Sequence, residues 1–197
     1  MSADSDTGDR GDTRTAIMEA TYRALCTHGY ADLTIQAIAD EFEKSKSLLY
    51  YHYETKDDLL LDFLDWLLER WKDELREDEA DDVESFVDGI LPRELGEERE
   101  EFRAAIVEIR AQAASKPAYR ERFTRSDDLF RGVLVERIEA GVDRGAYRDV
   151  APEATADLLM SVIDGAMLRR ATTDADVMGN TRDGVDVYVA RVLRGEQ

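Results

Sequence analysis

The sequence has very little cysteine and very little histidine. Its 197 residues include one cysteine, Cys26, and two histidines, His28 and His52. A single cysteine cannot form an internal disulfide, and so few sulfur and imidazole groups exclude a multi-cysteine or histidine-rich metal centre. We therefore expect no metal and no cofactor, and we expect Cys26 to be a small buried residue.

Long hydrophobic runs are also absent. Mean hydropathy is -0.48, and no apolar stretch approaches the roughly 20 residues that a membrane span requires. The first residues lack the basic and apolar regions of a secretory signal, so we expect a cytoplasmic location. With 43% hydrophobic residues, the chain can still bury the core of one domain or two small ones.

Positive charge is scarce relative to negative charge. The chain has 45 acidic residues and 26 basic ones, of which only five are lysines, and its net charge is -19. This composition is similar to that of proteins that function in molar salt, although an acidic protein from an ordinary cytoplasm is the alternative. The segment 77–101 alone has twelve acids, which favours a solvated surface over a divalent-metal site. Net charge by itself argues against a nucleic-acid partner.

Apolar spacing predicts about nine helices and no strand, so the expected fold class is all-α. Residues 1–11 are polar and acidic, and we expect a disordered tail. A helix over 12–28 precedes two short helices, the first capped by Thr34 and the second, which is capped by Ser45, ending near His52. Because two short helices cannot bury themselves, the first three helices form one unit.

A longer helical region follows this unit. Thr55 and Asp58 have the spacing of a capping box before an apolar run that reaches Trp71, and a helix so apolar on most sides is expected to be sandwiched. A short helix and a loop with Pro92 come next. The remaining helices are expected around 102–113, 117–141, 152–171 and 183–194. The domains are therefore 12–56, a helix-turn-helix unit, and 57–197, a helical domain.

The second short helix has side chains that suit the major groove of DNA. Lys46, Ser47 and Leu48 lie on its first turn and can meet guanine, a polar base edge and a thymine methyl. Gln36 on the preceding helix can meet adenine. Side chains suited to phosphates are Thr34, Ser45, Tyr50, His52 and Lys56, and Tyr51 suits either a base or a phosphate. Tyr53 is expected to be a packing aromatic residue.

Local charge resolves the conflict with the acidic composition. Three of the five lysines lie between residues 44 and 56, where Glu54 is the only acid, so this window has a charge of +2. In molar salt, counterion release contributes little, and base contacts and non-ionic contacts must carry more of the affinity.

The stretch 13–61 resembles the TetR family of transcriptional regulators. The resemblance covers about a quarter of the chain and rests on ordered matches: Ile17, Ala20, Gly29, Tyr30, Thr34, Ile38, Ala39, Ser45, the run Leu49–Tyr53, Lys56, Leu59 and Leu60. In one departure, Glu43 and Lys44 replace the usual glycine and small apolar residue of the turn. If Glu43 must adopt a left-handed conformation, the strain is roughly 1–2 kcal/mol.

The resemblance implies that the rest of the chain binds an effector and forms a homodimer on a palindromic operator. The implied effector is apolar or amphipathic, and its pocket is expected near Trp66, Phe86, Phe102, Ile106, Tyr119, Phe130 and Met160. The implied dimer interface lies on the last two helices, at Leu159, Val162, Ile163, Met167, Val185, Tyr188, Val189 and Val192.

Three functions follow from these observations. The first is a ligand-responsive repressor that binds double-stranded DNA. The second is a helical small-molecule-binding or interaction protein without DNA binding, for which Glu43 is the main argument. The third, an enzyme, is disfavoured because the sequence has no phosphate-binding loop and no nucleophile motif.

Overall fold

The computed structural model describes residues 4–43, 45–77 and 82–195, and in this part of the chain every regular element is a helix. The elements are α1 (Asp4–His28), α2 (Ile35–Glu41), α3 (Lys46–His52), α4 (Lys56–Glu77), α5 (Val83–Ile90), α6 (Glu97–Gln112), α7 (Pro117–Asp143), α8 (Pro152–Thr172), α9 (Met178–Tyr188) and a π-helix, η1 (Val189–Arg194), which continues α9. The predicted all-α fold is confirmed. None of these helices is long and apolar enough to cross a bilayer.

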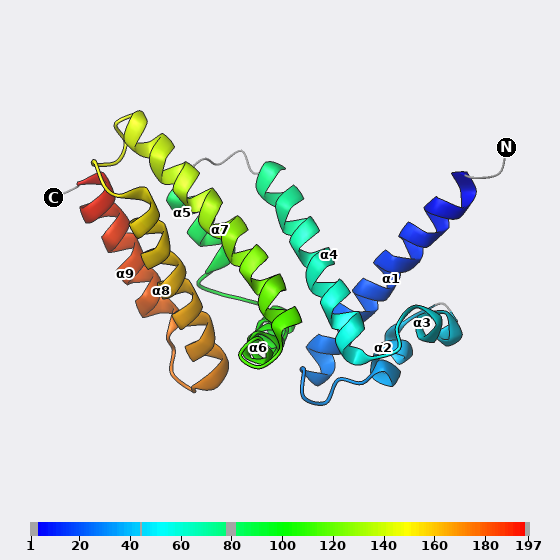
Figure 1. The fold of residues 1–197 in the computed structure, drawn as a ribbon. Coiled ribbons are helices and arrows are strands. Elements are labelled where there is room, and N and C mark those ends of the chain that lie inside the picture. Colours follow the sequence, from blue (N-terminus) through cyan, green and yellow to red (C-terminus); the bar gives the residue numbers. More distant parts are fainter. Residues whose placement is uncertain (1–3, 44, 78–81, 196–197) are drawn as a thin grey trace.

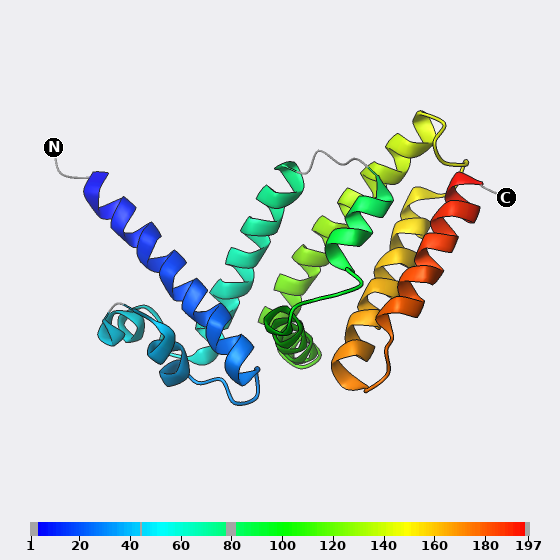
Figure 2. The ribbon, with the colours of Figure 1, turned by 180° about the vertical axis from the view of Figure 1, so that it is seen from behind.

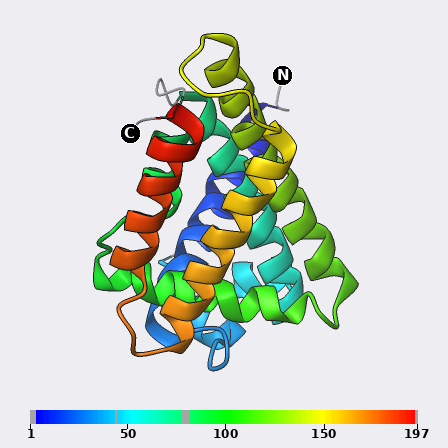
Figure 3. The same cartoon turned by 90° about the vertical axis from the view of Figure 1, so that its left-hand side faces the viewer.

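The helices are arranged in two groups with α4 between them (Figure 1). α1, α2 and α3 lie at one end of the molecule, and α7, α8 and α9 lie side by side at the other end. Seen from behind, the red and orange helices of the C-terminal part are on the side opposite α3 (Figure 2). α6 runs across the other helices and passes the C-terminal half of α8 (Figure 3).

Two apolar clusters hold the molecule together. The N-terminal core joins α1, α2, α3 and α4 to α6 and the start of α7, and its fully buried members include Leu25, Leu49 and Phe63. The C-terminal core is built from α5, α7, α8 and α9. α4 contacts α1 on one side and α7 on the other, as its apolar circumference predicts. Burial of these side chains supplies the main driving force for the fold.

Three helix starts differ from the predictions. α6 begins at Glu97 and not near residue 102, and three acids in its first turn favour the N-terminal end of a helix. α1 begins at Asp4 and not at Asp12, so the prediction of a disordered tail is wrong for residues 4–11, and residues 1–3 of that tail lie outside the described residues. Extending an existing helix costs little, and acidic residues favour its N-terminal end. α9 begins at Met178, five residues before the predicted start, because Met178 and Arg182 are buried by tertiary packing.

The turn between α2 and α3 also differs from the expectation. Lys44 lies outside the described residues, but Glu43 is described, and no described residue other than glycine has a positive φ. Glu43 therefore does not adopt the left-handed conformation, and the strain that its side chain would have caused there is absent.

Candidate nucleic-acid interface

α3 is held against the molecule by one face and presents the other to solvent. Leu49 is completely buried in the N-terminal core, and Leu48 packs partly against the same core. On the opposite face, Tyr51 is 83% exposed and Tyr50 is 48% exposed. The alternation follows from the 3.6-residue helical period, since an anchored Leu49 directs its neighbours outward.

The predicted caps of the two short helices differ in detail. Thr34 caps α2, because its hydroxyl accepts a hydrogen bond of 3.0 Å from the Ala37 amide. Ser45 is at the N-cap position of α3 but makes no side-chain bond to the helix. Its hydroxyl shares a hydrogen bond of 2.6 Å with that of Ser47 instead. Thr34, Ser45 and Ser47 are all exposed, so their hydroxyls are open to a ligand.

Three of the predicted DNA-contacting residues are linked by a network that includes an acid not among the predicted site residues. Tyr50 donates a hydrogen bond of 3.0 Å to the Gln36 side-chain oxygen. The Gln36 side-chain nitrogen donates 2.9 Å to Asp40, and Lys46 forms an ion pair with the same carboxylate. Hydrogen bonds from Lys46 and Gln36 lower the pKa of Asp40. The spacing of Gln36 and Asp40, four residues apart on one helix face, could have indicated this partner.

Lys56 and His52 occupy different settings. His52 is exposed at the end of α3. Lys56 is half-buried at the start of α4, where its ammonium donates 3.1 Å to the Tyr30 carbonyl and lies 4.4 Å from the centre of the Tyr30 ring. In the structure, Lys56 therefore joins the start of α4 to the segment that follows α1. Its contact with a DNA phosphate stays a prediction.

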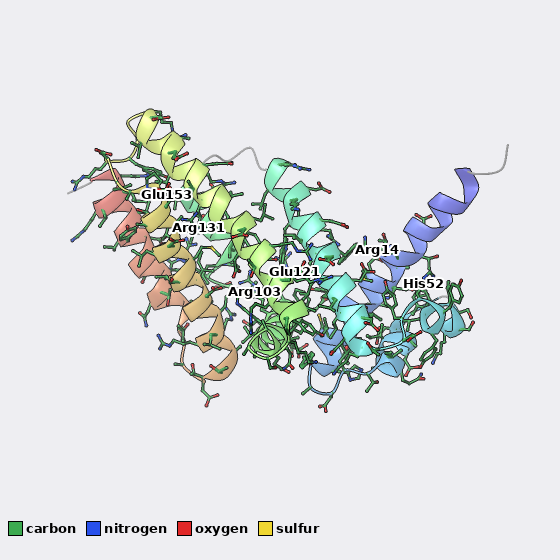
Figure 4. The ribbon with its side chains drawn as sticks, in the orientation of Figure 1. Arg14, His52, Arg103, Glu121, Arg131 and Glu153 are labelled. Carbon is green, nitrogen blue, oxygen red and sulfur yellow. The ribbon has the colours of Figure 1, made fainter. Side chains whose placement is uncertain are left out.

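Tyr53 is half-buried and packs against the N-terminal core, as predicted. Its hydroxyl donates to Asp62 on α4, and Arg14 on α1 donates a hydrogen bond of 2.7 Å to the same carboxylate. Figure 4 labels Arg14 on α1. Burial acts to raise the pKa of Asp62, but the bonds from Arg14 and Tyr53 prevail and lower it. These contacts fix α1, the end of α3 and α4 relative to one another.

A second set of polar contacts joins α4 to α7. Asp57 accepts 2.6 Å from Lys116 and 3.0 Å from Tyr119. Asp65, two turns further along α4, pairs with Arg122 and Arg125 on α7. The bond from Lys116 is the main reason that the pKa of Asp57 is lowered. α4 is therefore bound by charged side chains to the helices on both sides of it.

The seven residues predicted for an effector pocket are divided between the two cores. Trp66, Phe102, Ile106 and Tyr119 belong to the N-terminal core, and Phe86, Phe130 and Met160 belong to the C-terminal core. None of the seven lines either of two surface grooves, one between α6 and α8 and one between α8 and α9. The structure does not bring these seven side chains together around one of these grooves.

The eight residues predicted for the dimer interface fall into two sets. Four are buried in the C-terminal core of their own chain: Leu159, Ile163, Val185 and Val189. Two of these, Leu159 and Val185, also line the groove between α8 and α9. Their helix faces pack on α7 and on each other. The other four remain partly or largely accessible: Val162, Met167, Tyr188 and Val192. Leu158, which the sequence analysis did not select, is 47% exposed and lines the groove between α8 and α9 with Val162 and Tyr188.

Among the described residues, no group of three or more histidine, cysteine, aspartate or glutamate side chains is placed to hold a metal ion. Cys26 is buried, as expected, and burial raises the pKa of its thiol to about 11.

A helix-turn-helix unit with an exposed, polar second helix, joined to a larger helical domain, defines the class of helical DNA-binding regulators.

Comparison with known proteins identifies the family. Residues 17–63 match the family "Bacterial regulatory proteins, tetR family", and residues 79–194 match the family "BetI-type transcriptional repressor, C-terminal". The chain therefore belongs to the TetR family of transcriptional regulators, which bind DNA and are not enzymes.

Solved structures and curated relatives agree with this assignment. A TetR transcription regulator from Haloarcula marismortui is 39% identical, with a TM-score of 0.83 over 93% of this chain and 99% of that one. A regulator from Saccharomonospora viridis, solved in complex with choline, has a TM-score of 0.76 and 20% identity over 93% and 98% of the two chains. The repressor AcnR of Corynebacterium diphtheriae is 25% identical over 89% of this chain and 90% of its own.

Proposed function

We propose that this chain is a repressor that binds a palindromic operator as a homodimer and is released by a small effector. The observation that carries the proposal is the exposed face of α2 and α3. There Lys46, Tyr50 and Tyr51 stand outward from α3, which Leu49 anchors, and Gln36 stands outward from α2. The same face offers Thr34, Ser45, Ser47 and His52 to the rim of the groove.

The symmetric pairing is supported by the groove between α8 and α9. Its volume is about 390 Å³, and its lining includes Leu158, Val162 and Tyr188. A second copy related by a two-fold axis would cover this apolar surface, and a two-fold pair of helix-turn-helix units reads a palindrome.

Release by an effector is supported by the contacts of α4. A ligand bound in the C-terminal domain acts on α7, and α7 is tied to α4 through Asp57 and Asp65. α4 is tied in turn to α1 through Asp62 and Arg14. A ligand that prefers one orientation of α4 shifts the population of dimers whose α3 helices fit DNA. The choline held by the Saccharomonospora protein supports a small molecule as the kind of effector.

The charge of -19 supports adaptation to concentrated salt, where screening relieves the repulsion among carboxylates. We expect the melting temperature of the protein to rise when KCl is increased from about 0.1 M to about 2 M. An unchanged or lower melting temperature contradicts this adaptation.

Fluorescence anisotropy with labelled DNA from upstream of the gene, in concentrated KCl, tests the DNA-binding surface. The double variant Lys46→Ala, Tyr50→Phe should bind at least about tenfold more weakly, because a good base contact contributes roughly 1–3 kcal/mol. Lys72→Ala removes an exposed lysine on α4 and is the matched control. Equal binding by the double variant refutes these residue roles, and no binding by the wild-type chain favours a helical ligand-binding protein without DNA binding.

A further inference from the structure

A cleft of about 250 Å³ lies where α6 crosses the C-terminal half of α8. α6 contributes Glu100, Arg103 and Ala104, and α8 contributes Met167, Arg170 and Ala171. Figure 4 labels Arg103 on α6. The cleft therefore combines a wall of methyl and thioether groups with two guanidinium groups that come from different helices.

Both arginines have hydrogen-bond donors that the protein leaves unused. The Nη1 atoms of Arg103 and Arg170 are buried and have no hydrogen-bond partner among the described residues. Buried donors are nearly always paired, so unpaired donors on two arginines that line one cleft point to an acceptor from outside the chain.

Of the two arginines, Arg103 has fewer polar contacts within the described part of the chain. Arg170 forms an ion pair with Glu100 through its other terminal nitrogen. In the described part of the chain, Arg103 has no ion pair and no hydrogen bond. Burial, and then the neighbouring positive charge of Arg99, lower the pKa of Arg103, and no carboxylate opposes them. Although the chain has 45 acids, none of those in the described residues pairs with this guanidinium.

We propose that the cleft between α6 and α8 binds a small organic anion with a carboxylate or phosphate group and a short apolar body. The acid group accepts hydrogen bonds from Arg103 and Arg170, whose planar guanidinium groups suit both kinds of oxyanion. Because the two Nη1 atoms are closed off from solvent, the guanidinium groups turn slightly to reach it. The apolar body lies against Ala104, Met167 and Ala171.

This inference deepens the proposed function, on which it rests, because it gives the effector an acidic group and places it on α8. The acids Glu100 and Glu101 at the cleft restrict the site to ligands whose negative charge reaches the arginines, since a charge left at the rim is repelled.

Isothermal titration calorimetry with the full chain, at constant ionic strength, tests the site. The probes are hexanoate, hexyl phosphate and hexanol, which share one apolar body. At least one of the two acids should bind at least tenfold more tightly than hexanol, and the tighter acid identifies the preferred group. Equal binding of all three probes, or no binding of either acid, overturns the proposal.

The variant Arg103→Met distinguishes a binding role from a structural one. It should weaken binding of the preferred acid at least tenfold and raise the melting temperature of the unliganded protein, because a buried charge without a partner is removed. Arg131→Met, which breaks the surface pair with Asp157, is the matched control and should leave binding unchanged. Unchanged affinity in Arg103→Met, or a lower melting temperature, contradicts the proposal.

The calorimetry contains no DNA, so its result is independent of operator binding. If the acid binds but does not release operator DNA, the site is retained and its regulatory role fails. Another outcome is that neither acid binds while the double variant Lys46→Ala, Tyr50→Phe still weakens operator binding. In that outcome the proposed anion site is wrong, and the proposed DNA-binding function stands.

Discussion

At the scale of single residues, Asp40 holds together side chains that we propose contact DNA. Its carboxylate holds Lys46 in an ion pair and accepts a hydrogen bond from Gln36, which in turn accepts one from Tyr50. The network orders these groups before DNA arrives. It also places a negative charge beside the surface that must approach phosphates.

Asp40→Asn should therefore tighten DNA binding. Removal of one unit charge about 4 Å from a cation is worth roughly 1 kcal/mol in water, which corresponds to about a fivefold gain in affinity. Fluorescence anisotropy at two KCl concentrations measures the gain, which should shrink as salt increases. Asp73→Asn makes the same charge change on α4, beside Arg76, and should have little effect. A weaker complex with Asp40→Asn would show that ordering outweighs repulsion.

At the scale of elements, a close contact joins the end of α7 to the loop after it. Tyr147 is buried, its hydroxyl accepts 3.1 Å from the Val83 amide and donates 2.9 Å to Glu84, and burial raises its pKa to about 12. The ring lies directly on Gly141 of α7. A Cβ at that position would lie 2.1 Å from a ring carbon, so only glycine lets the two elements meet.

Gly141→Ala should destabilise the protein by about 1–3 kcal/mol, because the ring or the helix must shift. Gly132→Ala, on the same helix, meets no atom within 4 Å and should stabilise it by about 0.5–1 kcal/mol through lower backbone entropy of the unfolded chain. Urea unfolding followed by circular dichroism measures both. Similar effects of the two substitutions would disprove the role of the Tyr147 contact.

The contact of α4 with α1 and with the end of α3 depends on an ionised Asp62. Because the pKa of Asp62 is lower in the folded chain than in the unfolded one, its contribution to stability is present above the unfolded value, about 4. It is lost as pH falls through the folded value.

Asp62→Asn should lower the free energy of unfolding at pH 7 by about 1.5–3 kcal/mol, since Arg14 and Tyr53 lose a charged acceptor. The deficit should shrink as the pH is lowered from about 5 to about 3. Urea unfolding at several pH values tests this, with Asp73→Asn as a control that should follow the wild-type pH dependence. A deficit that stays constant with pH rules out the carboxylate as its cause.

At the scale of the whole molecule, the surface proposed for DNA, on α2 and α3, and the surface proposed for pairing, on α8 and α9, lie at opposite ends (Figure 1). Leu158 and Val192, 47% and 43% exposed, are apolar groups on α8 and η1 that no element of the described chain covers fully. A second copy that packs on these groups would cover them. Such a pairing would also set the distance between the α3 helices of the two copies.

Leu158→Arg should convert the proposed dimer to a monomer, because two buried arginines would face each other across the two-fold axis. Size-exclusion chromatography with light scattering reports the mass, and operator affinity should fall in parallel. Thr124→Arg, exposed on α7, is the matched control. A wild-type monomer, or an unchanged mass for Leu158→Arg, excludes this interface.

The fold could be predicted further than the site. In the described residues, the all-α architecture, most helix ends and the cap at Thr34 follow from spacing and capping chemistry. The start of α9 could not be predicted, because polar residues and two glycines hide a helix that tertiary burial of Met178 and Arg182 stabilises. The sequence could not show which apolar residues of α8 and α9 belong to the core of the chain and which are available to a partner. Apolar residues recur with the same helical spacing in both cases.

The sequence alone determined the helical architecture and the residues of α3 suited to DNA, because helical period, caps and residue chemistry act over four positions or fewer. Only the tertiary structure decided that Asp40 faces Lys46 and that Asp62 joins Arg14 and Tyr53. It also decided that Arg103 and Arg170 line one cleft, each with an Nη1 that has no partner among the described residues. Arg14 is 48 residues from Asp62, and Arg103 and Arg170 are on different helices far apart in the chain. Even the pairs that are nearer in sequence join two elements, so all of these arrangements depend on how whole helices pack.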